Sequence, residues 1–174
     1  MADSKKRTNG GGAAKDGNQD EPGVEVQVQV IGQFIKDLSF ENPALSRLAE
    51  GQGESPSLKL EVNVKAERMG QPDHFESAIE FKAEAANDKG TFYVLEVVYA
   101  GLFRIRNLPD QHLEPFLLVN CPTLIFPFLR RLVADITREG GFPPLLLDPV
   151  DFGTLYMRRR QEAAESEGKG GGKA

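Results

Sequence analysis

The stretch TLIFPFLRRLVADITREGGFPPLLLDPVDF, residues 123–152, decides the fold because its apolar residues first repeat with a helical period and then lose it. Large apolar residues recur every four positions through its first half. This pattern predicts one amphipathic helix over residues 123–139, started by Asn120 and Pro122 and ended by a pair of glycines. We expect Pro127 to kink this helix or to leave one carbonyl unpaired.

The loop that follows, GGFPPLLLDPVDF at residues 140–152, is both proline-rich and apolar. Its two glycines and three prolines exclude a regular helix and a central strand. Loops normally run over the surface and carry polar groups. Two interpretations therefore stay open, because the apolar residues either plug the core of the domain or bind a partner. Asp151 is expected to cap a last helix that carries Phe152, Leu155 and Tyr156 on one face.

Four segments upstream of the helices alternate between apolar and polar residues, as strands do. They cover residues 24–40, 58–66, 75–85 and 91–105, and the last is apolar on both faces. A bulge is expected at Ile31 and Gly32, where the first alternation changes phase. The sequence NDKG, residues 87–90, predicts a hairpin between the third and fourth strands. Four strands followed by two helices predict an α+β fold with a four-stranded antiparallel sheet.

A sheet that is apolar on both faces needs two covers, and two helices can supply only one of them. The residues of the fourth strand show this clearly, since Val94 and Val98 flank Glu96 on the face opposite to Leu95 and Val97. We therefore expect the second face to meet another subunit. Glu96, taken alone, is also explained as a charge that discourages unwanted strand pairing.

Composition divides the chain into three parts. Residues 1–23 contain no Val, Ile, Leu or aromatic residue, and residues 157–174 are nearly as poor. Both are predicted to be disordered tails, with the end of the last helix at the start of the second. The domain expected between them, residues 24–156, carries 12 Lys and Arg against 19 Asp and Glu, a net charge of −7. This balance disfavours nucleic acid and favours a basic partner.

The residues give no support for catalysis. A single cysteine excludes an internal disulfide and a Cys-based metal site. His74 and His112 are the only histidines, and neither has the spacing of a metal site or of a base beside a nucleophile. We predict no metal, no cofactor and no enzyme, and a hydrolase closed by the apolar loop is the weakest alternative. With no signal peptide and no apolar run of about 20 residues, the expected location is cytoplasmic, without membrane insertion.

Three blocks of the chain resemble the SecB protein-export chaperone family, in the family's order. Residues 120–156, NCPTLIFPFLRRLVADITREGGFPPLLLDPVDFGTLY, are similar to its C-P-x-x-[IL]-F-P helix start and its R-x-G-F-P-x-L-x-L-x-P-[VI]-[ND]-F segment. Residues 28–43, VQVIGQFIKDLSFENP, are similar to its first strand. Residues 96–103, EVVYAGLF, share its glycine-phenylalanine ending. The resemblance covers the whole predicted domain.

The resemblance implies an ATP-independent cytosolic chaperone, assembled as a homotetramer that is a dimer of dimers. Such a protein binds unfolded secretory precursors, keeps them competent for translocation and delivers them to the SecA motor ATPase. In the family the apolar loop and the last helix flank long grooves for extended client segments. The residues that this places at the client groove are Phe142, Leu145, Leu147, Phe152 and Tyr156.

The resemblance also implies a docking surface for SecA on the flat, acidic outer face of the sheet. The matching residues are Asp37, Glu41, Val94 and Glu96, and Val94 replaces a family leucine. In the family, SecA contacts this surface largely through its Lys- and Arg-rich zinc-binding tail, so the zinc belongs to SecA. One departure is the tail from residue 157 onward, which is usually acidic or neutral in the family and here has a net charge of +2. A general holdase or a chaperone dedicated to one partner, without an export role, remains the alternative function.

Overall fold

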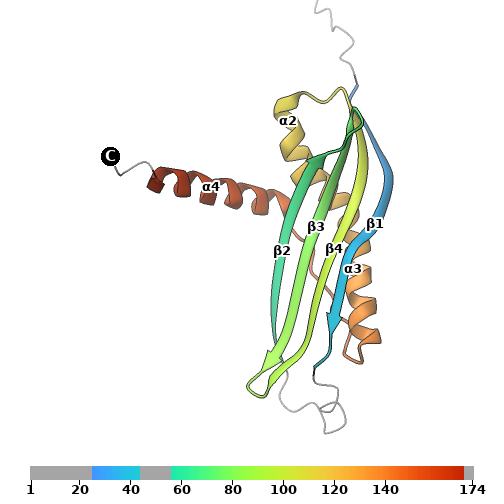
Figure 1. Ribbon diagram of the computed structural model, residues 1–174, viewed down its shortest axis with the longest axis vertical. Coiled ribbons are helices and arrows are strands. Elements are labelled where there is room, and N and C mark those ends of the chain that lie inside the picture. Colours follow the sequence, from blue (N-terminus) through green and yellow to red (C-terminus); the bar gives the residue numbers. More distant parts are fainter. Residues whose placement is uncertain (1–24, 44–55, 171–174) are drawn as a thin grey trace, which may run out of the picture.

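The structure is a computed structural model that describes residues 25–43 and 56–170. Its strands are β1 Gln27–Glu41, β2 Ser57–Arg68, β3 His74–Asn87 and β4 Gly90–Arg106. Its helices are α2 Asp110–Pro115, the π-helical segment η1 Phe116–Asn120, α3 Cys121–Glu139 and α4 Phe152–Gly170. The sheet carries α3 along one face, while α4 projects away from the β2 side (Figure 1). This arrangement confirms the predicted α+β class.

All four strands form one antiparallel sheet in the order β1-β4-β3-β2, so that β1 and β2 are its edges. The hairpin predicted at residues 87–90 joins β3 to β4, and Gly90 there has a φ of 122°. The predicted irregularity in β1 lies between Val30 and Gly32. A second one, between Ile35 and Asp37, was not predicted and leaves Lys36 without a directly opposite partner.

The core lies between the sheet and α3. Strand β4 supplies its centre with Leu95, Val97 and Phe103, which are at most 1% exposed. Gly101 of β4 allows α3 to approach closely, because a Cβ atom there would lie 2.7 Å from the Phe103 ring and 3.0 Å from Ile125. Burying such side chains contributes about 25 cal/mol per Å² of apolar surface, so this contact fixes α3 on the sheet.

The helical run begins at Asp110, well before the start that the sequence pattern predicts, and it includes Asn120 as an interior residue without a capping hydrogen bond. Pro122 has no N–H, so a carbonyl in the preceding turn loses its usual donor. The wider turn η1 lies directly before this proline. Side-chain hydroxyls bind carbonyls of η1, since Ser77 Oγ donates to the Leu117 oxygen at 2.8 Å and Thr123 Oγ1 donates to the Val119 oxygen at 2.6 Å.

The run Asp110–Glu139 is long and apolar enough to cross a membrane, judged by length and composition alone. In this fold the run packs against the sheet instead. The apolar face of α3 is buried against the sheet through Ile125, Leu129 and Val133. The helix is therefore the core helix of the domain.

Helix α4 starts as predicted and ends later. Thr154 N–H donates to Asp151 Oδ1 at 2.9 Å, which confirms Asp151 as the cap. The helix then continues to Gly170, through residues for which a disordered tail was predicted. Ala, Gln, Glu and Arg favour helix even where nothing packs against them. The predicted tail at residues 1–23 lies outside the described residues.

Candidate functional site

The face of the sheet turned away from α3, here called the open face, carries the four residues that the resemblance assigns to SecA. Directly opposite residues of neighbouring strands point to the same side of a sheet. Glu41 of β1 lies opposite Val94 of β4, and Ser39 lies opposite Glu96. Asp37 lies opposite Val98. The structure thus brings Asp37, Glu41, Val94 and Glu96 together on one side of two adjacent strands.

The carboxylates of this group differ in their partners. Glu96 forms an ion pair with Lys82 of β3, which lies directly opposite it, with Nζ 2.5 Å from Oε1. The hydrogen bond to Glu96 raises the pKa of Lys82 and keeps its ammonium charged. Within residues 25–43 and 56–170, Asp37 and Glu41 form no ion pair. A basic partner would thus find these two carboxylates free and Glu96 occupied.

Glu84 of β3 was missed by the sequence analysis. It lies directly opposite Val94, on the side away from Glu41, so that Val94 is placed between two carboxylates. Glu84 also forms no ion pair with another residue of the described chain. Only the β3–β4 register reveals this neighbourhood, because the sequence shows alternation within a strand and not which residues face each other across strands.

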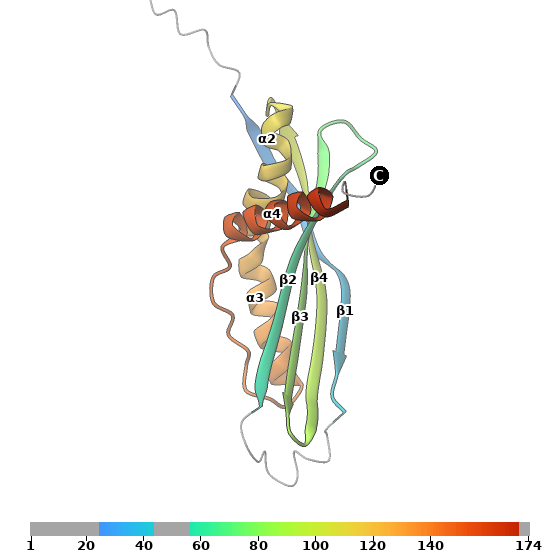
Figure 2. The same ribbon diagram turned by 90° about the vertical axis from the view of Figure 1, so that its left-hand side faces the viewer.

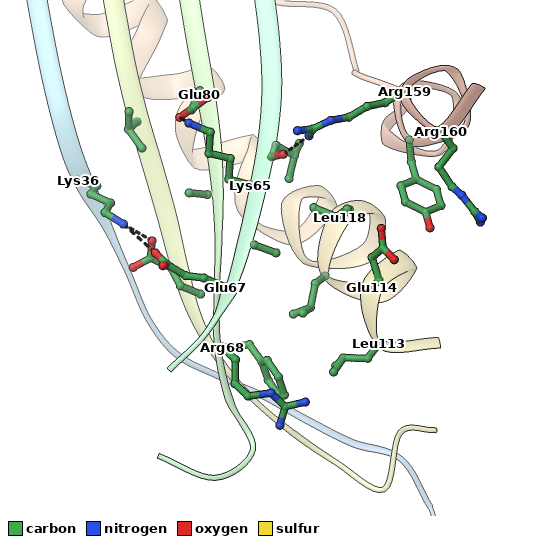
Figure 3. A pocket seen from close by; sticks show the side chains of 18 of the residues that line it. Lys36, Lys65, Glu67, Arg68, Glu80, Leu113, Glu114, Leu118, Arg159 and Arg160 are labelled. Atoms are coloured by element: carbon green, nitrogen blue, oxygen red, sulfur yellow. Dashed lines mark hydrogen bonds and ion pairs between the residues drawn. The ribbon is translucent and has the colours of Figure 1, made fainter. Parts of the chain in front are cut away.

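A groove lies beside the edge strand β2, between this strand, the helical run and the first turns of α4 (Figure 3). It also passes around the edge of the sheet onto the open face, where its lining includes Lys36, Asp37, Lys65 and Glu80. Next to it, beneath α4, lies a smaller cavity of about 260 Å³. Its apolar lining is Val62, Val64, Leu118, Phe152, Leu155 and Tyr156. Towards α2 the groove continues past Ala66, Phe75 and Leu113. Strand β2 is an edge strand, so this apolar channel runs beside free backbone groups.

Three of the five residues predicted to contact clients are buried in the monomer. Phe142, Leu147 and Phe152 are 7%, 4% and 2% exposed. Phe142 packs on Tyr93 with ring centroids 4.9 Å apart, and Phe152 packs on Phe126 at 5.7 Å. Most of their surface is already used within the monomer, although Phe152 also lines the cavity beneath α4, and their contact with clients stays a prediction.

The remaining loop residues are more accessible. Leu145 and Tyr156 are half-buried, and Tyr156 lines the groove. Leu146, which was not among the predicted residues, is 70% exposed. Neither helical nor strand periodicity applies to such a loop, and the sequence therefore could not separate the inward residues from the outward one.

Thr137 of α3 fixes the course of the loop. Its hydroxyl accepts a hydrogen bond from the N–H of Leu145 at 2.9 Å, and its carbonyl accepts one from the N–H of Phe142 at 3.1 Å. The loop then runs back along α3 to the start of α4 (Figure 2). Of the two interpretations of the apolar loop, plugging the core holds for Phe142 and Leu147.

Two potentially reactive side chains, Cys121 and His74, lie in surroundings that are typical of structural residues. Cys121 is fully buried, and desolvation raises the pKa of its thiol to about 12, which makes it a poor nucleophile. His74 lies 2.6 Å from the Pro72 carbonyl oxygen through Nδ1. In the part of the chain that the structure describes, no three His, Cys, Asp or Glu side chains gather as metal ligands would.

Comparison with known proteins now identifies the family. The model of the family described as "Preprotein translocase subunit SecB" matches residues 19–163. The chain belongs to the SecB family. A protein-export protein SecB from Parvibaculum lavamentivorans is 44% identical over 94% of this chain and 95% of its own length. Another, from a Bradyrhizobium species, is 41% identical over 92% of this chain and 96% of its own.

A solved structure supports the same fold. It is a Mycobacterium tuberculosis SecB-like chaperone in complex with a peptide from an antitoxin, with a TM-score of 0.56 and 18% identity, covering 71% of this chain and 90% of that one. The family resemblance and the fold predicted from the sequence are both confirmed. As a SecB family member, this protein is a chaperone with a role in preprotein export.

Proposed function

We propose that this SecB family protein is a cytosolic holdase that binds unfolded secretory precursors, works without ATP and delivers them to SecA. It acts by binding alone, with no catalytic step. The observation that carries the proposal is the division of one sheet into two unlike faces. Apolar groove residues lie on the α3 side, and Asp37, Glu41, Val94 and Glu96 lie together on the open face.

The groove suits clients that share no sequence. Tyr156, Leu118 and Val62 offer apolar contacts that many side chains can use. Edge strand β2 additionally offers backbone groups, which recognise any extended chain. Leu145 and Leu146 extend this apolar surface along the loop. Selection then depends on whether a client is unfolded and apolar, as an export chaperone requires.

The open face suits a basic partner. Carboxylates at Asp37 and Glu41 are unpaired among the described residues, and the predicted domain carries a net charge of −7. Val94, which lies between Glu41 and Glu84, supplies an apolar contact. Complementary charge speeds association and favours the correct partner over others. We therefore place SecA here, through a Lys- and Arg-rich segment.

Self-association as a homotetramer, built as a dimer of dimers, follows from the uncovered apolar surface. On the α3 side of edge strand β1, Val28, Val30, Ile35 and Leu38 are each 40–45% exposed, while Leu124 and Phe128 of α3 are 49% and 46% exposed. A monomer in water rarely keeps such a surface uncovered. This surface, and not the open face, is where we expect the other subunits.

The test is a variant with three substitutions, Asp37→Asn, Glu41→Gln and Glu96→Gln, measured in two assays. Binding to SecA is expected to weaken at least tenfold, because the three carboxylates act on the same cationic segment. Suppression of aggregation of an unfolded precursor should stay at the wild-type level. A matched control removes three carboxylates elsewhere, at Glu139, Asp148 and Glu165, none of which lies on the sheet or lines the groove.

The outcomes separate the functions. Equal loss in both assays would contradict the division between the two faces. Suppression of aggregation without any affinity for SecA, in the wild type as well, would instead support a general holdase or a chaperone dedicated to one partner. Salt provides a second test. If SecA binds through exposed charges, its affinity should fall as salt is raised, because the screening length falls to about 8 Å at physiological ionic strength.

A further inference from the structure

Arg159 of α4 binds the free edge of β2. One guanidinium nitrogen, Nη1, donates to the backbone oxygen of Val64 at 2.8 Å and to Asn63 Oδ1 at 3.2 Å. Figure 3 shows the side chain reaching from α4 to the strand. Its neighbours behave differently. Arg160 lies over the ring of Tyr156, and neither Arg158 nor Arg160 forms a hydrogen bond to β2 in the described structure.

The Val64 oxygen is one of a series. Strand β2 pairs only with β3, and in an antiparallel strand the backbone groups of every second residue point away from the partner. The oxygen of Val64 is directed outward, since it accepts from Arg159. The outward positions are then Leu58, Leu60, Val62, Val64 and Ala66. Their side chains lie on the α3 side, in register with buried residues of β3.

This edge matches an extended apolar segment of an unfolded chain. Leu58 and Leu60 are 43% and 45% exposed, and Val62 and Val64 line the groove. An added strand would pair with the outward backbone groups and lay every second side chain on the same apolar strip. To do so it must donate an N–H to the Val64 oxygen. Arg159 already occupies that acceptor.

We propose that Arg159 is a latch that competes with the client backbone for the edge of β2 and so sets how often this edge is open to an added strand. This inference rests on the proposed function, since it assigns regulation to the same groove. While the contact is closed, α4 is held against β2 and strand addition stops at Val64. Only the open fraction binds, and the apparent affinity falls in proportion to that fraction.

The contact is suited to reversible opening. Arg159 is exposed, and α4 is exposed from Met157 to Ser166, so that water can replace the hydrogen bond at small cost. The bond still joins a charged donor to a partly buried acceptor. Because these two contributions oppose each other, the open state is a minor population that remains accessible. A client that cannot pair with β2 as an added strand binds no more tightly when this contact is open.

The experiment compares Arg159→Ala with Arg158→Ala, which removes the same charge from the same helix. The probe is an extended apolar peptide of about ten residues, and a second version carries N-methyl groups at alternate backbone positions. In Arg159→Ala, affinity for the unmodified peptide is expected to rise about threefold to tenfold, with no comparable rise in Arg158→Ala. The N-methylated peptide should bind both variants and the wild type alike, since it cannot donate to β2.

A fall in peptide affinity in Arg159→Ala would overturn the latch and make Arg159 a client contact. An equal rise in both arginine variants would reduce the effect to net charge. Hydrogen exchange of the chain without peptide provides a readout that does not depend on clients. Amides in the first turns of α4 should exchange faster in Arg159→Ala than in Arg158→Ala. If that holds but no unfolded chain binds the wild type, the proposed function fails and the contact between α4 and β2 stands.

Discussion

Lys82 is expected to weaken the docking of a basic partner, because it neutralises Glu96. The two side chains face each other across β3 and β4 with Nζ 2.5 Å from Oε1, and both remain exposed, at 43% and 50%. An incoming lysine or arginine that binds Glu96 must displace this ammonium. Lys82→Gln removes the competitor and leaves the carboxylate in place. We therefore predict that this variant binds SecA more tightly than the wild type does.

The exposure of the pair limits the size of the effect. Exposed ion pairs in proteins are weak, since water and salt screen them, and the expected gain in affinity is about two- to fivefold. Most of it should appear in the association rate at low salt, because removing one positive charge also strengthens the field of the open face. The gain should shrink as salt is raised from about 50 to 300 mM.

The assay measures the affinity of SecA for the wild type and for three variants, either with one partner immobilised on a surface or by calorimetric titration. Arg158→Gln has the same change in charge on α4, away from the open face, and should not alter the affinity. The double variant Lys82→Gln with Glu96→Gln should lose the gain, since the carboxylate that Lys82 neutralises is then absent. Equal or weaker binding in Lys82→Gln would refute the competition. A gain that survives in the double variant would refute Glu96 as the residue concerned.

Three further predictions concern core packing, thiol reactivity and self-association. Gly140→Ala should destabilise the domain by about 1–3 kcal/mol in urea unfolding, since a Cβ there would overlap the ring of Phe40, whereas Gly32→Ala, with nothing within 4 Å, serves as the control. Native Cys121 should react with a thiol reagent at pH 8 about a thousandfold more slowly than in the unfolded chain, because a pKa of about 12 in place of 9.0 lowers the thiolate fraction by that factor. Ile35→Asp should reduce the oligomer mass in light scattering, because it places a charge on the exposed α3 side of β1.

Local patterns were sufficient for the strands, the hairpin and the cap of α4. Alternation in β2 and the turn at residues 87–90 depend on neighbours in sequence, and both are where the sequence placed them. The start of the helical run was not predictable in this way. Pro122 resembles a first-turn proline, but Ser77 lies 40 positions away from the carbonyl of Leu117 that it binds, and this long-range bond helps the helix to continue through the proline.

The candidate site likewise contains residues that local patterns predict and residues that only contacts between elements place. Alternation puts Asp37 and Glu41 on one side of β1, and Val94 and Glu96 on one side of β4. That the two sides are the same face follows only from the β1–β4 register. Lys82 and Glu84 become neighbours of this group only through the β3–β4 register. The inward packing of Phe142 depends on its contact with Tyr93, which is equally remote in sequence. Contacts between elements, rather than patterns within them, decide which apolar residues remain for a client.

The two faces of the sheet are joined by a hydrogen-bond path through the edge of β2. Asn63 accepts from Arg159 at 3.2 Å on the groove side and donates from Nδ2 to Glu80 Oε2 at 2.8 Å on the open face. Glu80 also pairs with Lys65 at 2.5 Å, and these contacts lower its pKa. Glu80 lies opposite Val98, whose other neighbour is Asp37. A client that displaces Arg159 therefore removes a partner of Asn63 and draws a positive charge away from Glu80, which lies one strand away from the docking residues.

This path predicts that client and SecA influence each other's binding, by the same factor in each direction, since linkage between two sites is reciprocal. We expect a factor of about two to five, measured as client affinity with and without saturating SecA. Asn63→Ala removes the middle of the path and should bring the factor to one while each partner still binds alone. Asn107→Ala, an amide that binds the carbonyl of Glu25 away from this path, is the matched control. Independent binding in the wild type would contradict the connection, and coupling that persists in Asn63→Ala would mean that it travels through the core rather than along the edge of β2.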